Sequence, residues 1–158
     1  MNKILNIIIA VAALTFCFSC NNEWEDEQFA HYVGFKAPIN SEGCTSVYLK
    51  MKPAGELANY KLPLVVSGST PHSGDLNVKV ELDLDTLEQL NLKNIGFNRQ
   101  DIWWEAVPED AYTFPSQVTI PSGQAVTLMD INIDLTKLDL VHRYILPLRV
   151  SENQPGYT

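Results

Sequence analysis

The most constraining feature of this sequence is an alternation of apolar and polar residues with a period of two. Even positions of Val78–Asp85 are apolar and odd positions are charged, and Tyr144–Ser151 follows a similar alternation. A period of two is typical of a β-strand with one buried and one solvated face. In Val126–Leu135 the apolar phase slips by one residue after Leu128, which predicts a β-bulge near Leu128 and Met129.

Weaker alternation, bounded by turn-forming residues, predicts the remaining strands. They are His31–Phe35, Ser46–Met51, Tyr60–Val66, Ile102–Ala106, and Tyr112 with Phe114 running into Val118–Ile120. Only two short helical turns are predicted, at Thr86–Asn91 and Thr136–Leu140. Seven or eight short strands with this spacing predict an all-β fold, an antiparallel immunoglobulin-like β-sandwich.

Two of the predicted strands share a proline-containing pattern. Tyr60-x-Leu-Pro-Leu recurs as Tyr144-x-Leu-Pro-Leu, which places Pro63 and Pro147 at equivalent positions. Proline has no backbone N–H to donate to a strand ladder. We therefore expect each of these prolines at a sheet edge or at a bulge.

The composition fits one folded, acidic domain. The chain has 158 residues, with 19 Asp and Glu against 11 Lys and Arg and a net charge of −8. This balance argues against nucleic acid as a partner, because phosphate binding rests on clustered Lys and Arg. The sequence contains no nucleophile elbow, phosphate-binding loop or paired-histidine motif. We predict no catalytic residues, no cofactor and no metal, and hence that the protein is not an enzyme.

Residues 1–19 are predicted to be a lipoprotein signal peptide. Lys3 supplies a positive charge, and Ile4–Phe18 is an apolar run too short for a comfortable bilayer span. Ser19 followed by Cys20 resembles the lipobox of bacterial lipoproteins. Cleavage there would leave the Cys20 thiol to carry a diacylglycerol, which would anchor the chain to a membrane. The alternative is an ordinary secretory signal that is cut nearby.

Residues 20–28 are predicted to be an acidic, flexible tether, because adjacent like charges repel and bury nothing. The acidic run Glu23–Glu27 resembles the signal that marks surface-exposed lipoproteins in Bacteroidetes. We predict a lipid-anchored protein of the outer membrane that faces the cell surface, and a periplasm-facing orientation is the alternative. The remaining residues, 29–158, form the predicted β-sandwich domain.

Several motifs occur in an order that resembles a known family. They are Tyr60-x-Leu-Pro-Leu-x-Val-Ser-Gly, Val78-x-Val-x-Leu-Asp83, Val107–Thr113, Val118–Gly123, and Leu138-Asp139 before Tyr144-x-Leu-Pro-Leu. Over roughly Phe29–Val150 this order resembles the domain-of-unknown-function family seventeen thirty-five. The resemblance implies an immunoglobulin-like module of Bacteroidetes secreted lipoproteins, often encoded in polysaccharide-utilisation gene clusters. Many members carry further C-terminal domains, so a stand-alone module and a truncated gene both remain open for this chain.

The segment Asn98–Glu105 contains the predicted binding residues. In an extended chain Trp103 and Trp104 point to opposite faces, so at most one of them enters the core by that route. An exposed indole ring suits the C–H face of a sugar, and the side chains of Asp101 and Arg99 suit its hydroxyl groups. These four residues are the predicted glycan-binding candidates. The alternative is that both tryptophans are packing residues that cover a sheet edge.

Together these patterns predict a surface-exposed lipoprotein module that assists glycan capture in a polysaccharide-utilisation system without catalysis. Its expected partners are the membrane, through the lipid on Cys20, a polysaccharide or oligosaccharide, and an outer-membrane transporter complex. The alternative is a structural spacer or protein-interaction module that docks to an outer-membrane complex through an exposed strand edge. Asp85-Thr86-Leu87 also resembles an O-glycosylation sequence of Bacteroides-type secreted proteins, which makes Thr86 a candidate for modification.

Overall fold

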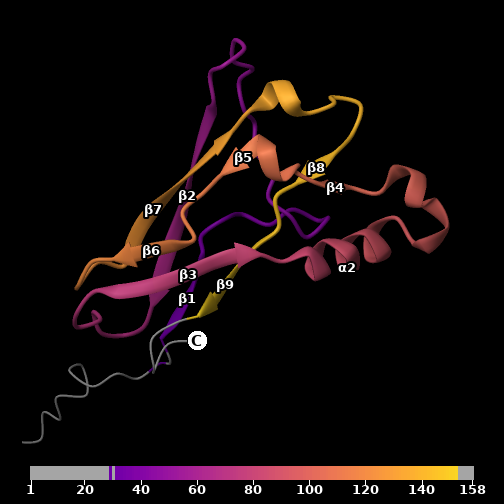
Figure 1. The fold of residues 1–158 in the computed structure, drawn as a ribbon. Helices are drawn as coiled ribbons and strands as arrows, with labels where there is room; N and C mark the ends of the chain where they lie inside the picture. Colours follow the sequence, from indigo (N-terminus) through magenta and orange to yellow (C-terminus); the bar gives the residue numbers. More distant parts are fainter. Residues whose placement is uncertain (1–28, 30, 153–158) are drawn as a thin grey trace, which may run out of the picture.

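The computed structural model describes residues 29 and 31–152, and this part of the chain is mostly β (Figure 1). Its strands are β1 (Tyr32–Phe35), β2 (Ala58–Ser67), β3 (Leu76–Leu82), β4 (Glu105–Ala106), β5 (Tyr112–Thr113), β6 (Gln117–Ile120), β7 (Val126–Ile133), β8 (Tyr144–Ile145) and β9 (Leu148–Glu152). Its helices are α2 (Leu84–Asn94) and the 3-10 helices η1 (Phe97–Ile102), η2 (Glu109–Ala111) and η3 (Leu135–Lys137). Within these residues no helix combines the length and the apolar run that crossing a bilayer requires.

The strands form two larger antiparallel sheets and one short parallel pair. The first sheet has the order β1-β2-β7-β5, the second has the order β6-β3-β9, and β4 pairs with β8 in parallel. Both larger sheets contribute to one apolar core. Its most completely buried large side chains are Leu64 and Met129 from the first sheet and Leu76, Val78, Val80 and Ile120 from the second. Each such burial stabilises the fold by about 2 kcal/mol.

Of the two segments with the clearest alternation, Val78–Asp85 lies largely in β3, whereas the predicted single strand Tyr144–Ser151 is divided between β8 and β9, which lie in different sheets. The inward residues Leu76, Val78 and Val80 of β3 are buried and the residues between them are exposed. The strand is shorter than the alternation predicts, because Asp83 starts a helix in place of continuing the ladder. Leu84 consequently lies in the first turn of α2 and is exposed, not buried on the inner face. In the described part of the chain there are nine strands where seven or eight were predicted, and three of the nine are only two residues long.

The predicted bulge near Leu128 and Met129 is wrong. The register between β2 and β7 runs without interruption from Ala58↔Ile133 to Val65↔Val126. Met129 and Ile131 face the core, whereas Val126 and Leu128 are 44% and 54% exposed. The apolar residues at the start of β7 therefore lie on its outer face, and no slip of register is needed to accommodate them.

Two further predictions about strands are wrong. Ser46–Met51 forms no strand, although its residues favour one. Ile102–Ala106 contains only the two residues of β4, because Phe97–Ile102 coils into η1.

Pro63 lies opposite Leu128 of β7 in an unbroken register, so it forms no bulge. It stands one residue beyond Leu64–Ser67, the part of β2 that pairs with β1, which agrees with the predicted place at a sheet edge on that side. The carbonyl of Pro63 accepts a hydrogen bond from Lys36 N (2.8 Å), just beyond the end of β1. Because the N–H and C=O of one strand residue point to the same side, the missing donor faces the point where β1 stops. Pro147 lies in the break between β8 and β9.

Helix α2 is capped by the residue that ends β3. Asp83 Oδ1 accepts from the backbone N–H of Thr86 (3.2 Å), and Asp83 Oδ2 accepts from the Thr86 hydroxyl (2.7 Å). A carboxylate at this position satisfies backbone donors that the first helical turn leaves free. This cap explains why the helix begins earlier than the predicted turn at Thr86–Asn91 and grows to 11 residues.

We predict that Asp83→Ala lowers the free energy of unfolding at neutral pH by about 1 kcal/mol, because α2 loses its cap. The hydrogen bonds from Thr86 hold the pKa of Asp83 below its ordinary value. A carboxyl whose pKa is lower in the folded chain stabilises the fold above the unfolded pKa, and the contribution is lost as the pH falls through the folded pKa. Urea denaturation at about pH 7 and about pH 3 measures the change.

The matched control is Asp85→Ala, which removes an acidic residue from the first turn of the same helix. Asp85→Ala should lower the free energy of unfolding by less than half as much as Asp83→Ala. The difference in the free energy of unfolding between Asp83→Ala and the parent chain should be smaller at about pH 3 than at about pH 7. Equal losses for both variants, or a difference that does not depend on pH, would contradict the capping role.

Candidate functional site

The tryptophan segment is held in place by one buried side chain of α2. Asn91 is 2% exposed, and its Nδ2 donates to the backbone carbonyl of Trp104 (2.9 Å). Its Oδ1 accepts from the backbone N–H of Trp104 (2.9 Å). The amide of Asn91 therefore pairs with Trp104 as a neighbouring strand residue would, and satisfies both backbone groups away from water.

The indole ring of Trp104 is enclosed at this point. Trp104 is 4% exposed, and the guanidinium carbon of Arg143 lies 4.9 Å from the ring centroid. An arginine at this distance over an indole face makes a cation–π contact. Arg143 Nη2 also contacts both carboxylate oxygens of Glu42, at 3.0 and 3.3 Å. The charge of Glu42 thus holds the cation over the ring.

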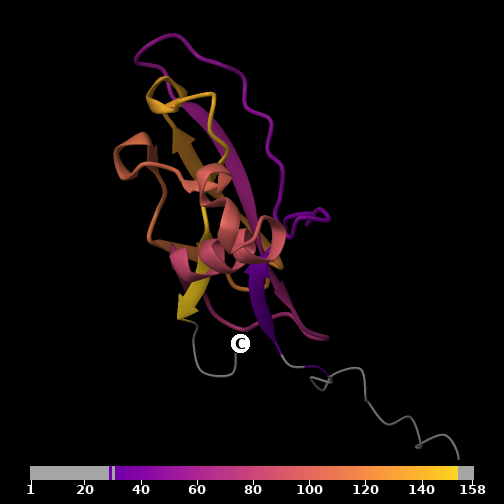
Figure 2. The same ribbon diagram turned by 90° about the vertical axis from the view of Figure 1, so that its right-hand side faces the viewer.

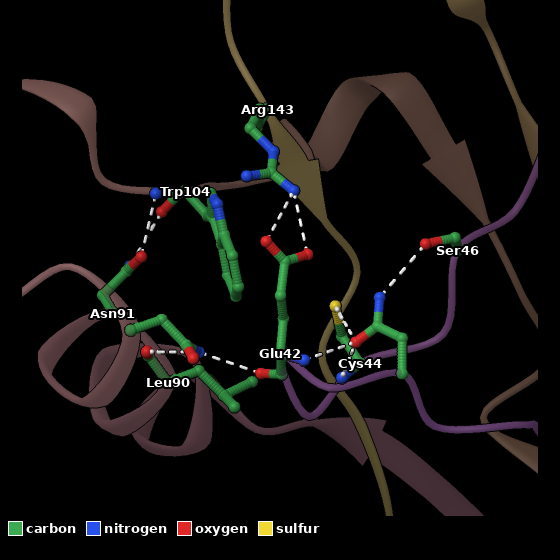
Figure 3. A network of polar contacts seen from close by, with 9 residues as sticks. Glu42, Cys44, Ser46, Leu90, Asn91, Trp104 and Arg143 are labelled. Atoms are coloured by element: carbon green, nitrogen blue, oxygen red, sulfur yellow. Dashed lines mark hydrogen bonds and ion pairs between the residues drawn. The ribbon is translucent and has the colours of Figure 1, made fainter.

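The loop that carries Glu42 is tied to α2 (Figure 3). Asn94 Nδ2 donates to the carbonyls of Glu42 (2.8 Å) and Leu90 (2.9 Å). Asn40 Oδ1 accepts from the backbone N–H groups of Glu42 and Cys44, at 2.9 and 3.2 Å. The asparagines, Glu42 and Arg143 join three segments that are far apart in the sequence.

The end of α2 positions the second tryptophan. The carbonyl of Asn91 accepts from the N–H groups of Ile95 (2.9 Å) and Gly96 (3.0 Å), and Gly96 then has a φ of 91°. A residue without Cβ adopts this backbone angle at little cost. Trp103 Nε1 donates to the carbonyl of Gly96 (3.0 Å), which leaves the ring half-buried with its polar group satisfied.

Helix η1 presents an exposed surface beyond this glycine. Arg99 Nε lies 3.4 Å from Asp101 Oδ1, and these side chains are 60% and 66% exposed. Phe97 is 71% exposed and Ile102 is 51% exposed. We call Phe97, Arg99, Asp101, Ile102 and Trp103 the η1 surface.

The predicted glycan-binding candidates have different environments. Trp104, one of the four candidates, offers no exposed ring, because the ring is enclosed under Arg143 and serves as a packing residue. The expectation that at most one of the two tryptophans enters the core is confirmed. Arg99 and Asp101 lie in η1 and form an ion pair, and Trp103 directly follows this helix. The role of these three residues in binding stays a prediction.

Phe97 was missed by the analysis of the sequence. The signal that could have revealed it is Gly96, which ends α2 with a positive φ and turns the next residue away from the helix axis. The sequence analysis predicted that the helical turn ends at Asn91, so Gly96 was not recognised as the residue that follows a helix. Phe97 was therefore not expected on an exposed surface.

The predicted modification site and the predicted lipid anchor lie away from the η1 surface in the sequence. Thr86 lies in the first turn of α2, where its hydroxyl donates to Asp83, and its modification stays a prediction. Cys20, with the signal peptide and the tether, lies outside the described residues. Among residues 29 and 31–152, no three His, Cys, Asp or Glu side chains gather closely enough to hold a metal ion.

A separate hollow has a volume of about 230 Å³, and the loops that line it lie at the end of the ribbon opposite α2 (Figure 1). It is lined by residues 66–72 and 123–125. His72 is 5% exposed, and its Nδ1 and Nε2 lie 2.9 and 2.8 Å from the carbonyl oxygens of Gly74 and Gln124. The imidazole joins the two loops, and the hollow is separate from the η1 surface.

The structure defines a small, mostly antiparallel β domain, and a family match identifies it further. The model of the family described as "Domain of unknown function (DUF4973)" matches residues 24–155, and the chain belongs to this family. The assignment to DUF1735, the family seventeen thirty-five, stays a prediction. No curated protein matches the chain.

Solved structures from Bacteroides share the fold. A multidomain protein including DUF1735 from Bacteroides ovatus is 39% identical, with a TM-score of 0.73, and the match covers 77% of this chain and 41% of that chain. An auxiliary nutrient binding protein from Bacteroides thetaiotaomicron is 24% identical, with a TM-score of 0.56 over 79% of this chain and 36% of that one. A proposed carbohydrate binding protein from Bacteroides ovatus is 18% identical, with a TM-score of 0.50 over 65% and 28%. This chain therefore corresponds to less than half of each neighbour.

We predict that Asn91→Ala destabilises the fold by about 2–3 kcal/mol, because a backbone donor and a backbone acceptor of Trp104 lose their partner in a buried position. Urea denaturation of the purified chain measures the change. Gln89→Ala, an exposed position of the same helix, is the matched control and should cost less than about 0.5 kcal/mol. Similar losses for the two variants would refute the role of Asn91 as a clamp.

Proposed function

We propose that the chain is a lipid-anchored module of the bacterial cell surface that assists the capture of polysaccharide and does not itself catalyse a reaction. The observation that carries this proposal is the η1 surface, where one short helix exposes an aromatic ring and a pair of charged groups. The proposed anchor is the thiol of Cys20, and the proposed location is the outer membrane. We also propose that the two antiparallel sheets belong to the immunoglobulin-like type of β-sandwich.

The chemistry of the η1 surface suits a sugar. The exposed ring of Phe97 offers an apolar face for the C–H groups of a pyranose. The Arg99 guanidinium supplies hydrogen-bond donors and the Asp101 carboxylate supplies acceptors, and hydroxyl groups use both. Trp103 adds half-buried aromatic area beside them.

The η1 surface is anchored before any ligand arrives. Trp104 follows Trp103 directly, and its backbone is fixed by Asn91 on α2. At the other end, the N–H groups of Ile95 and Gly96 bond to the carbonyl of the same Asn91. Because both ends of the segment are held, binding there requires less ordering of the chain. A surface fixed in this way suits recognition of a repeating polymer such as a polysaccharide.

The similarity to Bacteroides proteins supports the proposal. Two of the solved neighbours are described as a nutrient binding protein and a carbohydrate binding protein. Their sequence identity to this chain is low, and the likeness shows only that the fold is shared. That this chain binds similar ligands is a proposal.

A second candidate function is a structural spacer or protein-interaction module that docks to an outer-membrane complex. The observation that favours it is an edge of β2 that pairs with no strand among residues 29 and 31–152. From Ala58 to Leu62, β2 pairs with β7 on one side, whereas β1 reaches only Leu64–Ser67 on the other. The two functions are compatible, because the edge and the η1 surface consist of different residues.

We predict that the soluble chain starting at residue 20, with Cys20→Ser, binds polysaccharide in affinity electrophoresis or on a glycan array. Phe97→Ala should weaken binding at least about tenfold, because an exposed aromatic ring contributes much of the contact energy. Tyr48→Ala is the control, since it removes a ring that is even more exposed than Phe97 and lies outside the η1 surface. Absence of any glycan ligand, or equal losses for both variants, would overturn the capture proposal.

We predict that the full-length protein fractionates with outer membranes and that Cys20→Ser releases it, because the lipid attaches through this thiol. Protease treatment of intact cells measures the orientation, and the surface-exposed chain should be cleaved. Cys17→Ser is the control and should leave the anchor unchanged. Continued membrane association of the Cys20→Ser variant would refute the lipid anchor.

A further inference from the structure

The open edge of β2 has backbone groups directed toward an unoccupied position. Pro63 O points toward β1, and Val66 N donates to Ala125 O (2.9 Å) on the side of β7. Successive strand residues direct their backbone groups to alternate sides. The N–H and C=O groups of Asn59 and Lys61 therefore face away from β7. Within the described chain they form no backbone hydrogen bond.

A second unpaired segment lies beside this edge. Residues 45–52 run next to the first half of β2 without joining its sheet (Figures 1 and 2). The sequence of this segment favours a strand, yet none of its residues makes a backbone hydrogen bond with β2. Val47, Tyr48 and Met51 are 41%, 96% and 52% exposed. Polar backbone and apolar side chains are thus both exposed here.

The charge of this region differs from that of the chain as a whole. Residues 45–61 carry Lys50, Lys52 and Lys61 against the single acid Glu56, whereas the whole chain has a net charge of −8. Lys61 lies 3.9 Å from Asp130 and remains 60% exposed. A pair of this geometry on the surface contributes little and leaves the lysine available to a partner.

We propose that the edge of β2 between Ala58 and Leu62 accepts an extended segment of a partner protein in which apolar residues alternate with acidic residues. The partner strand would receive hydrogen bonds from the backbone of Asn59 and Lys61 and donate to their carbonyls, as in β-strand addition. Its apolar side chains would contact the exposed apolar groups of residues 47–51. Its carboxylates would face Lys50, Lys52 and Lys61.

The same lysines disfavour a second copy of this chain as the occupant. Antiparallel pairing of two β2 edges would bring the lysines of both copies together, and like charges facing each other across a strand pair destabilise it. Lysines on an edge strand oppose self-pairing in this way. The charge that prevents self-association thus selects an acidic strand. This inference does not depend on the glycan proposal, because it uses none of the residues of the η1 surface.

The test uses two nine-residue peptides as probes, one alternating valine with glutamate and one alternating valine with lysine. Binding to the soluble chain starting at residue 20, with Cys20→Ser, is followed by NMR and by amide hydrogen exchange. The glutamate peptide should slow exchange at Asn59 and Lys61, and added salt should weaken its binding. Lack of protection at these two amides, equal binding of the lysine peptide, or self-association of the chain through this edge would overturn the proposal.

Two sets of variants separate the backbone contribution from the charge. Lys61→Pro removes an N–H that faces the open side, so no bond to β7 is lost, and it should weaken binding about tenfold more than Lys61→Gln. Lys50→Glu with Lys52→Glu changes only exposed positions of residues 45–52 and should reverse the preference toward the lysine peptide. An unchanged preference after the charge reversal would contradict the proposed partner chemistry even if Lys61→Pro failed to fold.

Discussion

The side chain of Asn91 supplies to Trp104 the pair of hydrogen bonds that a neighbouring strand would otherwise provide. A buried amide is stabilising only if its donor and its acceptor are both satisfied, and here one backbone residue satisfies both. Because Trp104 is fixed to α2, Arg143 can lie over its indole ring and reach Glu42 in a distant loop. The helix, the aromatic segment and the loop thereby become one unit beside the two sheets.

This unit and the open edge of β2 give the molecule two separate surfaces with different chemistry. The η1 surface combines an aromatic ring with a cation and an anion, which is suited to the apolar and hydroxyl faces of a sugar. The edge of β2 combines unpaired backbone with lysines, which is suited to an acidic strand. The two proposed activities, glycan binding and contact with a partner protein, therefore use different residues. The chain belongs to a family described as a domain of unknown function, and it shares its fold with solved Bacteroides proteins.

Local patterns in the sequence were sufficient for part of the fold. The alternation in β3 predicts its buried face, because one side of that strand meets the core along its whole length. The alternation in β7 misleads, since Val126 and Leu128 are apolar yet lie on the outer face, and periodicity alone does not reveal which phase points inward.

The parts that could not be predicted depend on contacts between distant residues. Asn91 and Trp104 are 13 residues apart and lie in different elements, and Glu42 and Arg143 are 101 residues apart, so apolar periodicity reveals neither pair. The central claim is that the Asn91 clamp orders the η1 surface before ligand binds, and amide hydrogen exchange at Trp104 tests it most directly. We predict that this amide exchanges as slowly as the core strands, through global unfolding. Exchange at the rate of an exposed loop would contradict the account.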